Sequence, residues 1–333
     1  MKLASSDDPH PLLHALLADE TERCAMHGVD PGLFERALLA STRSFLARPG
    51  KAFRARLVEG AFQVAGGQPA ALPRAALEAI ELMHAGSLII DDIEDDADER
   101  RGAPALHRMV GTARALNAGN WLYFVALSRL SALSLSATRE RDLSRAAHIC
   151  LMRCHEGQAL DLGVRISELR KSDVRGVAEA TSRLKTGALM GLAAQLGATV
   201  ACASAADVKA LAHFGEQIGV ALQMLDDLTC FSCDDRAHKA LEDLRAERPS
   251  FIWAFAAEAL DEVTYKHLAL QVKRSDAHET LRLRLAEAAA ERGRCAVRAL
   301  LSQALSAAKQ HFVDNPALEL LSLELLRLEN SYG

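Results

Sequence analysis

A short stretch of the sequence carries carboxylates whose spacing could bind a metal ion. An apolar run ends at Asp91, Asp92 and Asp95. Residues four apart on a helix lie on one face, about 6 Å apart, so Asp91 and Asp95 point the same way with Asp92 beside them. Carboxylates this close repel one another unless a cation lies between them. Oxygen ligands suit Mg²⁺, which completes its coordination with water and substrate phosphates. The stretch predicts a magnesium site, although a solvated acidic helix end has the same pattern.

Basic side chains nearby and further along the chain could bind phosphate. Arg100 and Arg101 follow the aspartates and offer bidentate donors. Lys51 and Arg54 follow a Pro-Gly turn and share one face of a predicted helix start, where free amides favour anions. An ordinary basic helix start would look the same. Lys185 lies on an otherwise apolar helix, which an anionic ligand explains better than solvent exposure does.

A second apolar helix ends in the paired aspartates Asp226 and Asp227, a weak internal echo of the first motif. Cys230 stands where Asp95 stands in the first copy. Cys230 and Cys233 form a CxxC pair, but no second cysteine pair accompanies it, which argues against a zinc site.

The elements that must position these side chains are helices. Apolar residues recur at helical spacing from about Leu72 to the first aspartates, over 113–133, and over about 139–166. Gln158 and Asp161 share a face of the last of these helices, where they either bridge to other helices or serve a site.

Composition indicates one large all-α domain over residues 11–333, with residues 1–10 frayed. The 333 residues include only 9 Pro and 20 Gly, and no linker-like stretch interrupts the pattern. The net charge of −5 gives no reason to expect nucleic acid. Seven scattered cysteines fit reduced thiols in a cytoplasmic protein. No apolar run reaches membrane-spanning length and no signal peptide is evident, so stable membrane insertion is not expected.

Seven motifs, taken jointly, form a specific pattern. They are Pro49-Gly-Lys-x-x-Arg54, His84 with Ser87-Leu-Ile-Ile-Asp-Asp-Ile-Glu-Asp95, Arg100-Arg-Gly-x-Pro104 with His107, Asn117-x-x-Asn-Trp-Leu-Tyr-Phe124, His155-x-Gly-Gln-x-Leu-Asp161, Lys185-Thr-Gly187 and Gln223-x-x-Asp-Asp227. Over nearly the whole chain this pattern resembles the trans-isoprenyl diphosphate synthases, and is most similar to geranylgeranyl diphosphate synthases of the eukaryotic type.

The resemblance implies a fold and a set of residue roles. The fold would be a single-domain isoprenoid synthase bundle of helices around a deep central cavity, usually a homodimer. Two to three Mg²⁺ ions would be held by Asp91, Asp92, Asp95 and Asp226. The allylic diphosphate would contact Arg100, Lys185 and a lysine near 239, while isopentenyl diphosphate would contact Lys51, Arg54, His84 and Arg101. Thr186 and Gln223 would line the site of the allylic cation, and Asp227 would belong to the substrate site.

The implied reaction joins an allylic diphosphate, farnesyl or shorter, to isopentenyl diphosphate. Two departures from the family pattern concern lysines. His238 stands where the family has a lysine, with Lys239 one step away, and Arg248 replaces the next family lysine. Two alternatives are a terpene cyclase on the same scaffold and a non-catalytic regulatory subunit. A cyclase has no use for the isopentenyl diphosphate residues, and a regulatory subunit is expected to lose the first aspartate motif.

Product length should depend on side chains below the first aspartates. Gly86 and Ser87, about 7.5 Å below Asp91 on the same helix, put only small side chains on the wall of the predicted cavity. The floor would then be made by larger residues that match floor positions in eukaryotic-type relatives, although the same residues could be ordinary core. These candidates are Tyr123, Phe124 and His155. An open wall above a bulky floor predicts a C20 product.

Overall fold

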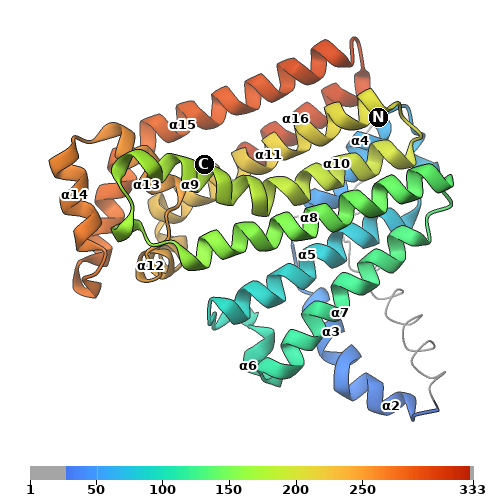
Figure 1. The fold of residues 1–333 in the computed structure, drawn as a ribbon, viewed down its shortest axis with the longest axis horizontal. Coiled ribbons are helices and arrows are strands. Elements are labelled where there is room, and N and C mark those ends of the chain that lie inside the picture. Colours follow the sequence, from blue (N-terminus) through green and yellow to red (C-terminus); the bar gives the residue numbers. More distant parts are fainter. Residues whose placement is uncertain (1–27, 51, 331–333) are drawn as a thin grey trace. The chain divides into compact units, whose positions relative to one another are not determined.

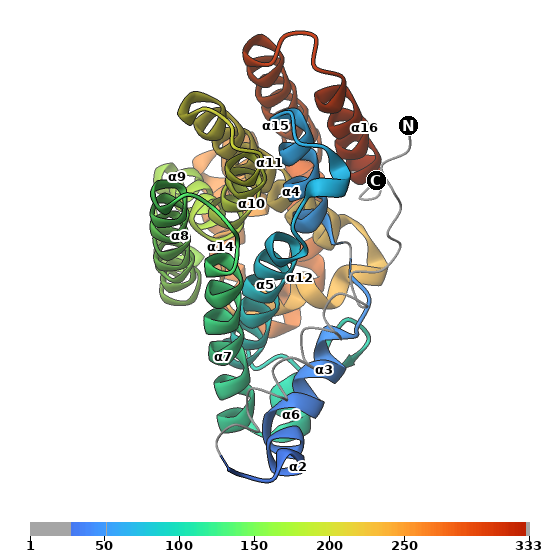
Figure 2. The ribbon, with the colours of Figure 1, turned by 90° about the vertical axis from the view of Figure 1, so that its right-hand side faces the viewer.

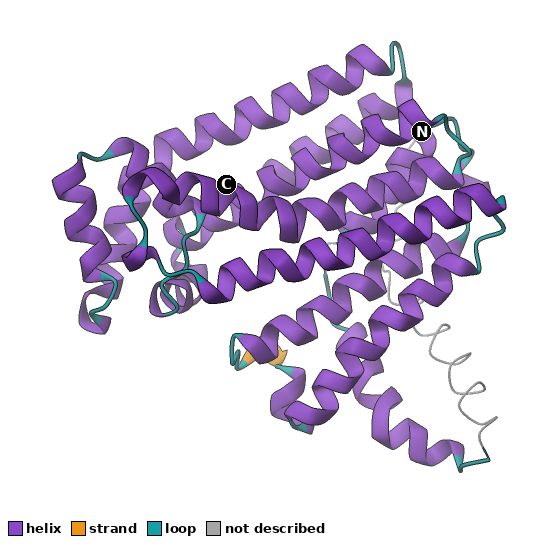
Figure 3. Cartoon of the chain, in the orientation of Figure 1, coloured by secondary structure: helices purple, strands orange, loops and turns teal. Residues whose placement is uncertain are grey.

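The computed structural model describes residues 28–50 and 52–330, and these residues are almost entirely helical (Figure 3). The only strands among them are β1 (Glu99–Arg100) and β2 (Ala103–Pro104), which pair antiparallel. The predicted all-α class is confirmed. The predicted frayed segment 1–10 and Lys51 lie outside the described residues. None of the described helices is both long enough and apolar enough to span a membrane.

The chain forms two compact units, called unit 1 and unit 2 below. Unit 1 comprises the described residues up to Arg145 together with Leu196–Ala203, and unit 2 comprises Ala146–Gln195 and the residues from Ser204 onward. The boundaries fall within α8 (Ala137–Gly163) and α10 (Ala188–Val200). The single domain and central cavity expected from the sequence stay predictions.

Unit 1 contains the helices that lead to the first aspartates and to the arginine pair. In chain order its other elements are α2 (Pro31–Phe34), the π-helical segment η1 (Glu35–Leu39), α3 (Ala40–Leu46), α4 (Phe53–Val64), the 3₁₀ turn η2 (Pro69–Ala71), α5 (Arg74–Glu94), α6 (Leu106–Val110) and α7 (Thr112–Ser131). Helix α5 begins directly after Pro73 and has Asp95 as its C-cap. Its apolar residues recur every three to four positions and are buried, as the sequence pattern predicts.

Helices α5 and α7 lie side by side and approach closely at two glycines (Figures 1 and 2). A Cβ atom added to Gly86 would lie 2.8 Å from the carbonyl oxygen of Gly119, and a Cβ atom added to Gly119 would lie 2.9 Å from Ile90. Only residues without a side chain allow this backbone contact. The contact therefore fixes how α5 is rotated against α7, and so how the aspartates at its end are presented.

Unit 2 is built around the apolar helix α13 (Phe251–Ala259), whose residues are almost all buried. Its elements after α8 are the 3₁₀ turn η3 (Ile166–Glu168), α9 (Lys171–Ser182), the π-helical segment η4 (Arg183–Gly187), the part of α10 up to Gln195, α11 (Ala205–Ser232), η5 (Asp234–Arg236), α12 (Ala237–Arg245), α13 (Phe251–Ala259), α14 (Glu262–Gln271), η6 (Ser275–Ala277), α15 (His278–His311) and α16 (Pro316–Asn330). The rings of Phe251, Trp253 and Phe255 on α13 are fully buried. Helix α13 packs against α9, α11 and α15, and α11 runs along α15 (Figure 1).

Candidate active site

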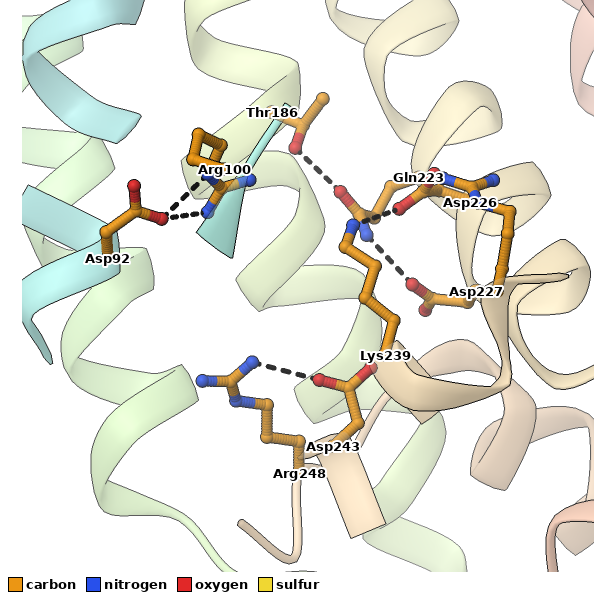
Figure 4. Close-up of polar contacts among 10 residues, drawn as sticks. Asp92, Arg100, Thr186, Gln223, Asp226, Asp227, Lys239, Asp243 and Arg248 are labelled. Carbon is orange, nitrogen blue, oxygen red and sulfur yellow. Dashed lines mark hydrogen bonds and ion pairs between the residues drawn. The ribbon is translucent and has the colours of Figure 1, made fainter. Parts of the chain in front are cut away.

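The first aspartates lie at the C-terminal end of α5, where a helix normally favours cations. Asp92 is fully buried, and its Oδ1 accepts a hydrogen bond from Arg100 Nε at 2.7 Å (Figure 4). Its Oδ2 is also buried and has no hydrogen-bond partner among the described residues. Burial raises the pKa of Asp92, and the Arg100 guanidinium opposes that rise. Asp91 is half-buried and Asp95 is exposed. Carboxylates at the negative end of a helix dipole are costly unless a cation joins them.

The arginine pair lies on a tight hairpin. Arg100 and Ala103 face each other across β1 and β2, and Arg101 and Gly102 form the two-residue loop with φ of 54° and 72°. Positive φ at both loop residues is typical of a type I′ turn, which suits the twist of a two-stranded hairpin. The hairpin places the two arginines next to each other, where they donate to different partners.

Arg48, a residue that the sequence reasoning did not select, holds this hairpin. Its side chain is buried and donates to the carbonyl oxygens of Arg100 at 3.1 Å and Pro104 at 2.9 Å. In return, Arg101 Nη1 donates to the Arg48 carbonyl oxygen at 3.4 Å. The guanidinium of Arg48 also lies 5.0 Å from the centre of the Phe45 ring. Arg48 therefore positions the arginine pair.

A second cationic group surrounds His84 on α5. Burial, together with the positive charges of Arg54 and Arg101, lowers the pKa of His84 well below its usual value, so its imidazole is neutral. His84 Nδ1 is buried and has no hydrogen-bond partner among the described residues. Glu81 lies one turn earlier and accepts a hydrogen bond at 3.1 Å from the backbone amide of Ala55 near the start of α4. The structure thus brings together three of the four residues assigned to isopentenyl diphosphate; the fourth, Lys51, is not described.

The residues assigned to chain length have different environments. Gly86 was expected to leave an open wall in the cavity. It is instead buried in close contact with Gly119 of α7, so this expectation is corrected. Ser87 is half-buried and donates to the His84 carbonyl oxygen at 2.8 Å. The ring of Tyr123 would lie 3.4 Å from a Cβ atom on Gly86. Tyr123 therefore lies beside Gly86, and its place at a deeper floor stays a prediction.

Phe124 and His155 do not have the burial that a floor requires. Phe124 is 71% exposed on α7. His155 on α8 is exposed, and its Nδ1 lies 2.8 Å from the Leu151 carbonyl oxygen of the preceding turn. A side chain that ends an apolar tunnel has to be buried. The structure therefore gives no support to these two as floor residues.

In unit 2, the neighbours Asp226 and Asp227 on α11 have opposite environments. Burial opposes ionisation of Asp226, but the charges of Lys239 and Arg236 outweigh it and lower the pKa. Asp227 is buried and accepts hydrogen bonds from Gln223 Nε2 and from the Phe251 amide, each at 2.8 Å. Burial raises its pKa to about 7. One Asp227 oxygen thus binds Gln223 on α11, and the other binds the first residue of α13. These bonds give Asp227 a structural role in addition to the predicted role in substrate binding.

Lys185 and Thr186 lie on the π-helical segment η4, which the sequence did not predict. Such single π turns are common at functional sites because they re-aim side chains. Thr186 Oγ1 donates to Gln223 Oε1 at 2.9 Å, which continues the hydrogen-bond chain to Asp227 (Figure 4). Lys185 Nζ pairs with Asp161 Oδ2 at 2.8 Å. The anion beside Lys185 in this structure is therefore Asp161. Asp161 on α8 thus bridges to η4, which is one of the two roles that the sequence analysis allowed for it.

The cations after α11 are placed around two carboxylates. Lys239 Nζ lies 3.3 Å from Asp226 Oδ2, and Arg248 Nη1 lies 2.9 Å from Asp243 Oδ1 (Figure 4). Burial raises the pKa of Asp243 to about 6, and Arg248 opposes that rise. The neighbouring His238 is exposed. Lys239 therefore contacts a carboxylate of the predicted site, and which of the two residues takes the role of the family lysine stays a prediction.

Arg236 is a second residue that the sequence reasoning missed. Its Nη2 donates to Asp226 Oδ1 at 2.8 Å. Its only sequence signal was a position in a polar loop ten residues after Asp226, which does not predict a contact. The thiol of Cys230, which replaces a third carboxylate, is buried, and burial raises its pKa to about 12.

The residues of the first motif fit a divalent cation. Among the described residues, no three His, Cys, Asp or Glu side chains converge as a ready-made metal site. The donors at the end of α5 are carboxylate oxygens, which Mg²⁺ prefers. The buried Asp92 Oδ2 lacks a hydrogen-bond partner there, and such an atom carries an uncompensated cost that a cation would remove.

Carboxylates at a helix end, clustered arginines and a neutral histidine define a helical protein suited to bind polyanions together with metal ions. A model of the polyprenyl synthetase family matches residues 35–286, and the chain belongs to this family. The family resemblance of the sequence motifs is confirmed.

Individual relatives carry consistent names. The chain is 32% identical over 213 residues to a short chain isoprenyl diphosphate synthase of Methanothermobacter thermautotrophicus, covering 63% of this chain and 62% of that protein. It is 34% identical over 196 residues to geranylgeranyl pyrophosphate synthase 2 of Zymoseptoria tritici, covering 58% and 55%. The alignments therefore span less than two thirds of these relatives.

Solved structures match over the full length. The geranylgeranyl pyrophosphate synthase of Corynebacterium glutamicum, complexed with isoprenyl diphosphate and magnesium, superposes with a TM-score of 0.78 at 25% identity and covers 100% of this chain and 99% of its own. The geranylgeranyl pyrophosphate synthetase of Pyrococcus horikoshii gives 0.73 at 23% identity, covering 95% of this chain and 98% of its own, which shows the fold.

Proposed function

We propose that this protein is a Mg²⁺-dependent prenyltransferase that joins an allylic diphosphate, farnesyl or shorter, head to tail to isopentenyl diphosphate and so makes geranylgeranyl diphosphate. The observation that carries the proposal is the group of Arg54, Arg101 and neutral His84, which consists of other residues than the Asp92–Arg100 pair. A condensing enzyme needs two diphosphate-binding groups. The names of the relatives support the reaction and the C20 product.

The carboxylates would hold two to three Mg²⁺ ions. Asp91, Asp92, Asp95 and Asp226 would be the ligands. When bound, Mg²⁺ would offset the negative charge that develops on the leaving diphosphate. The magnesium in the Corynebacterium structure supports this requirement.

The cations would divide between the two substrates. Arg100, Lys185, Lys239 and Arg248 would donate to the allylic diphosphate, and Lys51, Arg54, His84 and Arg101 would bind isopentenyl diphosphate. Lys185 and Arg248 would have to exchange Asp161 and Asp243 for phosphate oxygens. The Thr186 and Gln223 oxygens would face the electron-poor allylic carbon, and Asp227 would fix their orientation through its bond to Gln223.

A terpene cyclase is the nearest rival. A cyclase ionises the same allylic substrate but binds no second diphosphate, and so would not need Arg54, His84 and Arg101 together. A regulatory subunit would not need the intact first aspartate motif. Both features are present, which favours the condensing enzyme.

The assembly is proposed to be a homodimer in the cytoplasm that contacts small substrates rather than nucleic acid. Leu116 and Phe124 on α7 are 41% and 71% exposed and lie two helical turns apart. Exposed apolar side chains on one helix face suit contact with a second copy. The net charge of −5 opposes nucleic-acid binding.

Incubation of the purified chain with farnesyl diphosphate, labelled isopentenyl diphosphate and Mg²⁺ tests the proposal. Chromatography of the dephosphorylated product should give a labelled C20 alcohol, and EDTA should abolish it. An unlabelled hydrocarbon formed without isopentenyl diphosphate would identify a cyclase instead. No turnover with either substrate would favour the regulatory subunit.

A further inference from the structure

The loop between α12 and α13, residues 246–250, carries Arg248 and contains a strained residue. Glu247 has a φ of 55°, a left-handed conformation that residues other than glycine adopt only at a steric cost. Such a conformation persists where the surrounding contacts hold it. Arg248 follows at once, so the contacts that hold Glu247 also determine where the Arg248 side chain starts.

Hydrogen bonds from η3 and from the residue before it hold this turn. Arg165 Nη1 donates to the Ala246 carbonyl oxygen at 2.6 Å, and the Ile166 amide donates to the Glu247 carbonyl oxygen at 2.8 Å. The Ser167 hydroxyl donates to Oε2 of the Glu247 carboxylate. Ile166 is fully buried, and the other partners are half-buried. One segment thus holds both the backbone and the side chain of the strained residue.

The backbone held in this way directs the Arg248 guanidinium towards two carboxylates. Arg248 Nη1 donates to Asp243 Oδ1 at 2.9 Å, and its Nε lies 3.9 Å from Asp161 Oδ2 (Figure 4). The Arg248 side chain is 18% exposed. At the far end of the loop, the Phe251 amide donates to Asp227 Oδ2 at 2.8 Å. The loop is therefore fixed on both sides of Arg248.

We propose that Arg165 and Ser167 are positioning residues that hold the left-handed turn at Glu247, so that Arg248 presents its guanidinium to a diphosphate anion. The inference rests on the proposed function for the identity of the anion and for the role of Arg248. A guanidinium binds two phosphate oxygens only in a defined orientation. A shift of the backbone at Glu247 therefore weakens diphosphate binding even in a protein that stays folded.

Calorimetric titration of the purified full chain with inorganic diphosphate in Mg²⁺ tests the proposal as a double-mutant cycle. Arg165→Ala should raise the Kd about three- to tenfold where Arg248 is present, and less than about twofold in an Arg248→Ala background, because Arg165 acts through Arg248. Arg165→Lys should restore most of the affinity, since its ammonium group can donate to the Ala246 carbonyl oxygen. Ser167→Ala is a milder change that keeps all charges, and should raise the Kd about twofold or more, again only where Arg248 is present.

Arg170→Ala is the matched control, because Arg170 is an exposed arginine shortly after η3 whose side chain pairs with Asp173 on α9. It removes the same charge without removing a bond to the loop between α12 and α13. Urea unfolding of each variant separates stability from affinity. A purely structural role of Arg165 would lower the free energy of unfolding and leave the Kd of the folded protein unchanged.

Equal Kd values for the Arg165→Ala and Arg170→Ala variants would overturn the proposal. An Arg165→Ala effect of the same size with and without Arg248 would overturn it as well, and so would an Arg248→Ala variant that binds diphosphate as tightly as wild type. These measurements need no turnover. A protein that shows the coupling but transfers no prenyl group would refute only the proposed function.

Discussion

At the scale of a residue, the adjacent aspartates Asp226 and Asp227 are expected to differ in role. Asp226 should matter mainly for activity, and the more deeply buried Asp227 mainly for stability. Asp226→Ala should lower kcat/KM strongly and change the free energy of unfolding little, since its partners are solvent-accessible cations. Asp227→Ala should instead lower the free energy of unfolding by about 1–3 kcal/mol, because the Gln223 side chain and the Phe251 amide lose a buried acceptor. Urea unfolding beside activity per folded protein checks both. The reverse pattern would show that the roles are exchanged.

The raised pKa of Asp227 predicts how stability depends on pH. The folded protein keeps the proton up to a pKa of about 7, whereas the unfolded chain loses it near 3.8. Between these values the folded state binds more protons, so stability falls as pH rises from about 4 to 7 and levels off above. The shift corresponds to up to about 4 kcal/mol. Asp227→Asn should flatten this part of the curve, as measured by urea unfolding in EDTA at pH 5 and pH 8. An unchanged slope in the variant would assign the dependence to other groups, of which Asp243 is the first candidate.

Arg54 tests the second diphosphate group. Arg54→Ala should raise the apparent KM for isopentenyl diphosphate about tenfold or more, and change the KM for the allylic substrate little, because one charge-assisted contact is lost. Arg56→Ala is the control, since Arg56 is exposed two residues further along α4. A larger effect on the allylic substrate would mean that the two diphosphate groups are assigned the wrong way round.

Residue types predicted which side chains could bind metal or phosphate, but not which partners they have in the protein. Asp91, Asp92 and Arg100 were found because carboxylates and arginines are close in sequence. Arg236 and Arg48 were missed because their roles come from contacts with residues distant along the chain. The structural role of Asp227 depends on an amide 24 residues away, at the start of another helix. No local pattern contains that information.

At the scale of elements, long periodic segments were predicted well. The helix expected from about Leu72 to the aspartates is α5, and the helix expected over about 139–166 is α8. The π turn at Lys185 was not predicted, because one extra residue in a helical turn is set by packing and leaves no periodic signal. Spacing along α5 gave the depth of Gly86 below Asp91 but not the direction it faces.

The contact of Gly86 with α7 changes the expected effect of substitutions there. Gly86→Ala should lower the free energy of unfolding by about 1–3 kcal/mol, because its Cβ would lie 2.8 Å from the Gly119 carbonyl oxygen. Gly86→Phe should disturb the packing of α5 and α7 further, so it is a poor test of product length. Ser87→Phe, at a half-buried position, is the better test and should shift the product from C20 towards C15. Thermal unfolding and product chromatography separate the two effects, and a stable Gly86→Phe variant that makes C15 would restore the open wall.

At the scale of the whole molecule, the sequence alone was sufficient to predict the all-α class and the family. The low content of proline and glycine indicated the class, and the seven motifs spread along the chain indicated the family. The same information could not say which aromatic residues face inward. Phe124 and Tyr123 were both expected at the floor of a cavity because they match floor positions in eukaryotic-type relatives, yet adjacent helical residues point about 100° apart. The exposure of Phe124 requires a different explanation.

The proposed homodimer would account for that exposure. Phe124 is 71% exposed, and covering its ring with a second copy of the chain would remove apolar surface from water. Leu116, two turns away on the same face of α7, would be covered by the same contact. The wild-type chain should therefore elute in light-scattering chromatography at twice 35.9 kDa, and Phe124→Ser should shift the population towards the monomer as the protein is diluted. Val263→Ser is the control, because Val263 is 79% exposed on α14, away from α7 in the sequence and in a different unit. A wild-type mass of 35.9 kDa at every concentration would refute the dimer. If Phe124→Ser remained a dimer, α7 would not be its interface, because the loss of a ring at the centre of an interface is among the costliest truncations that an interface can undergo.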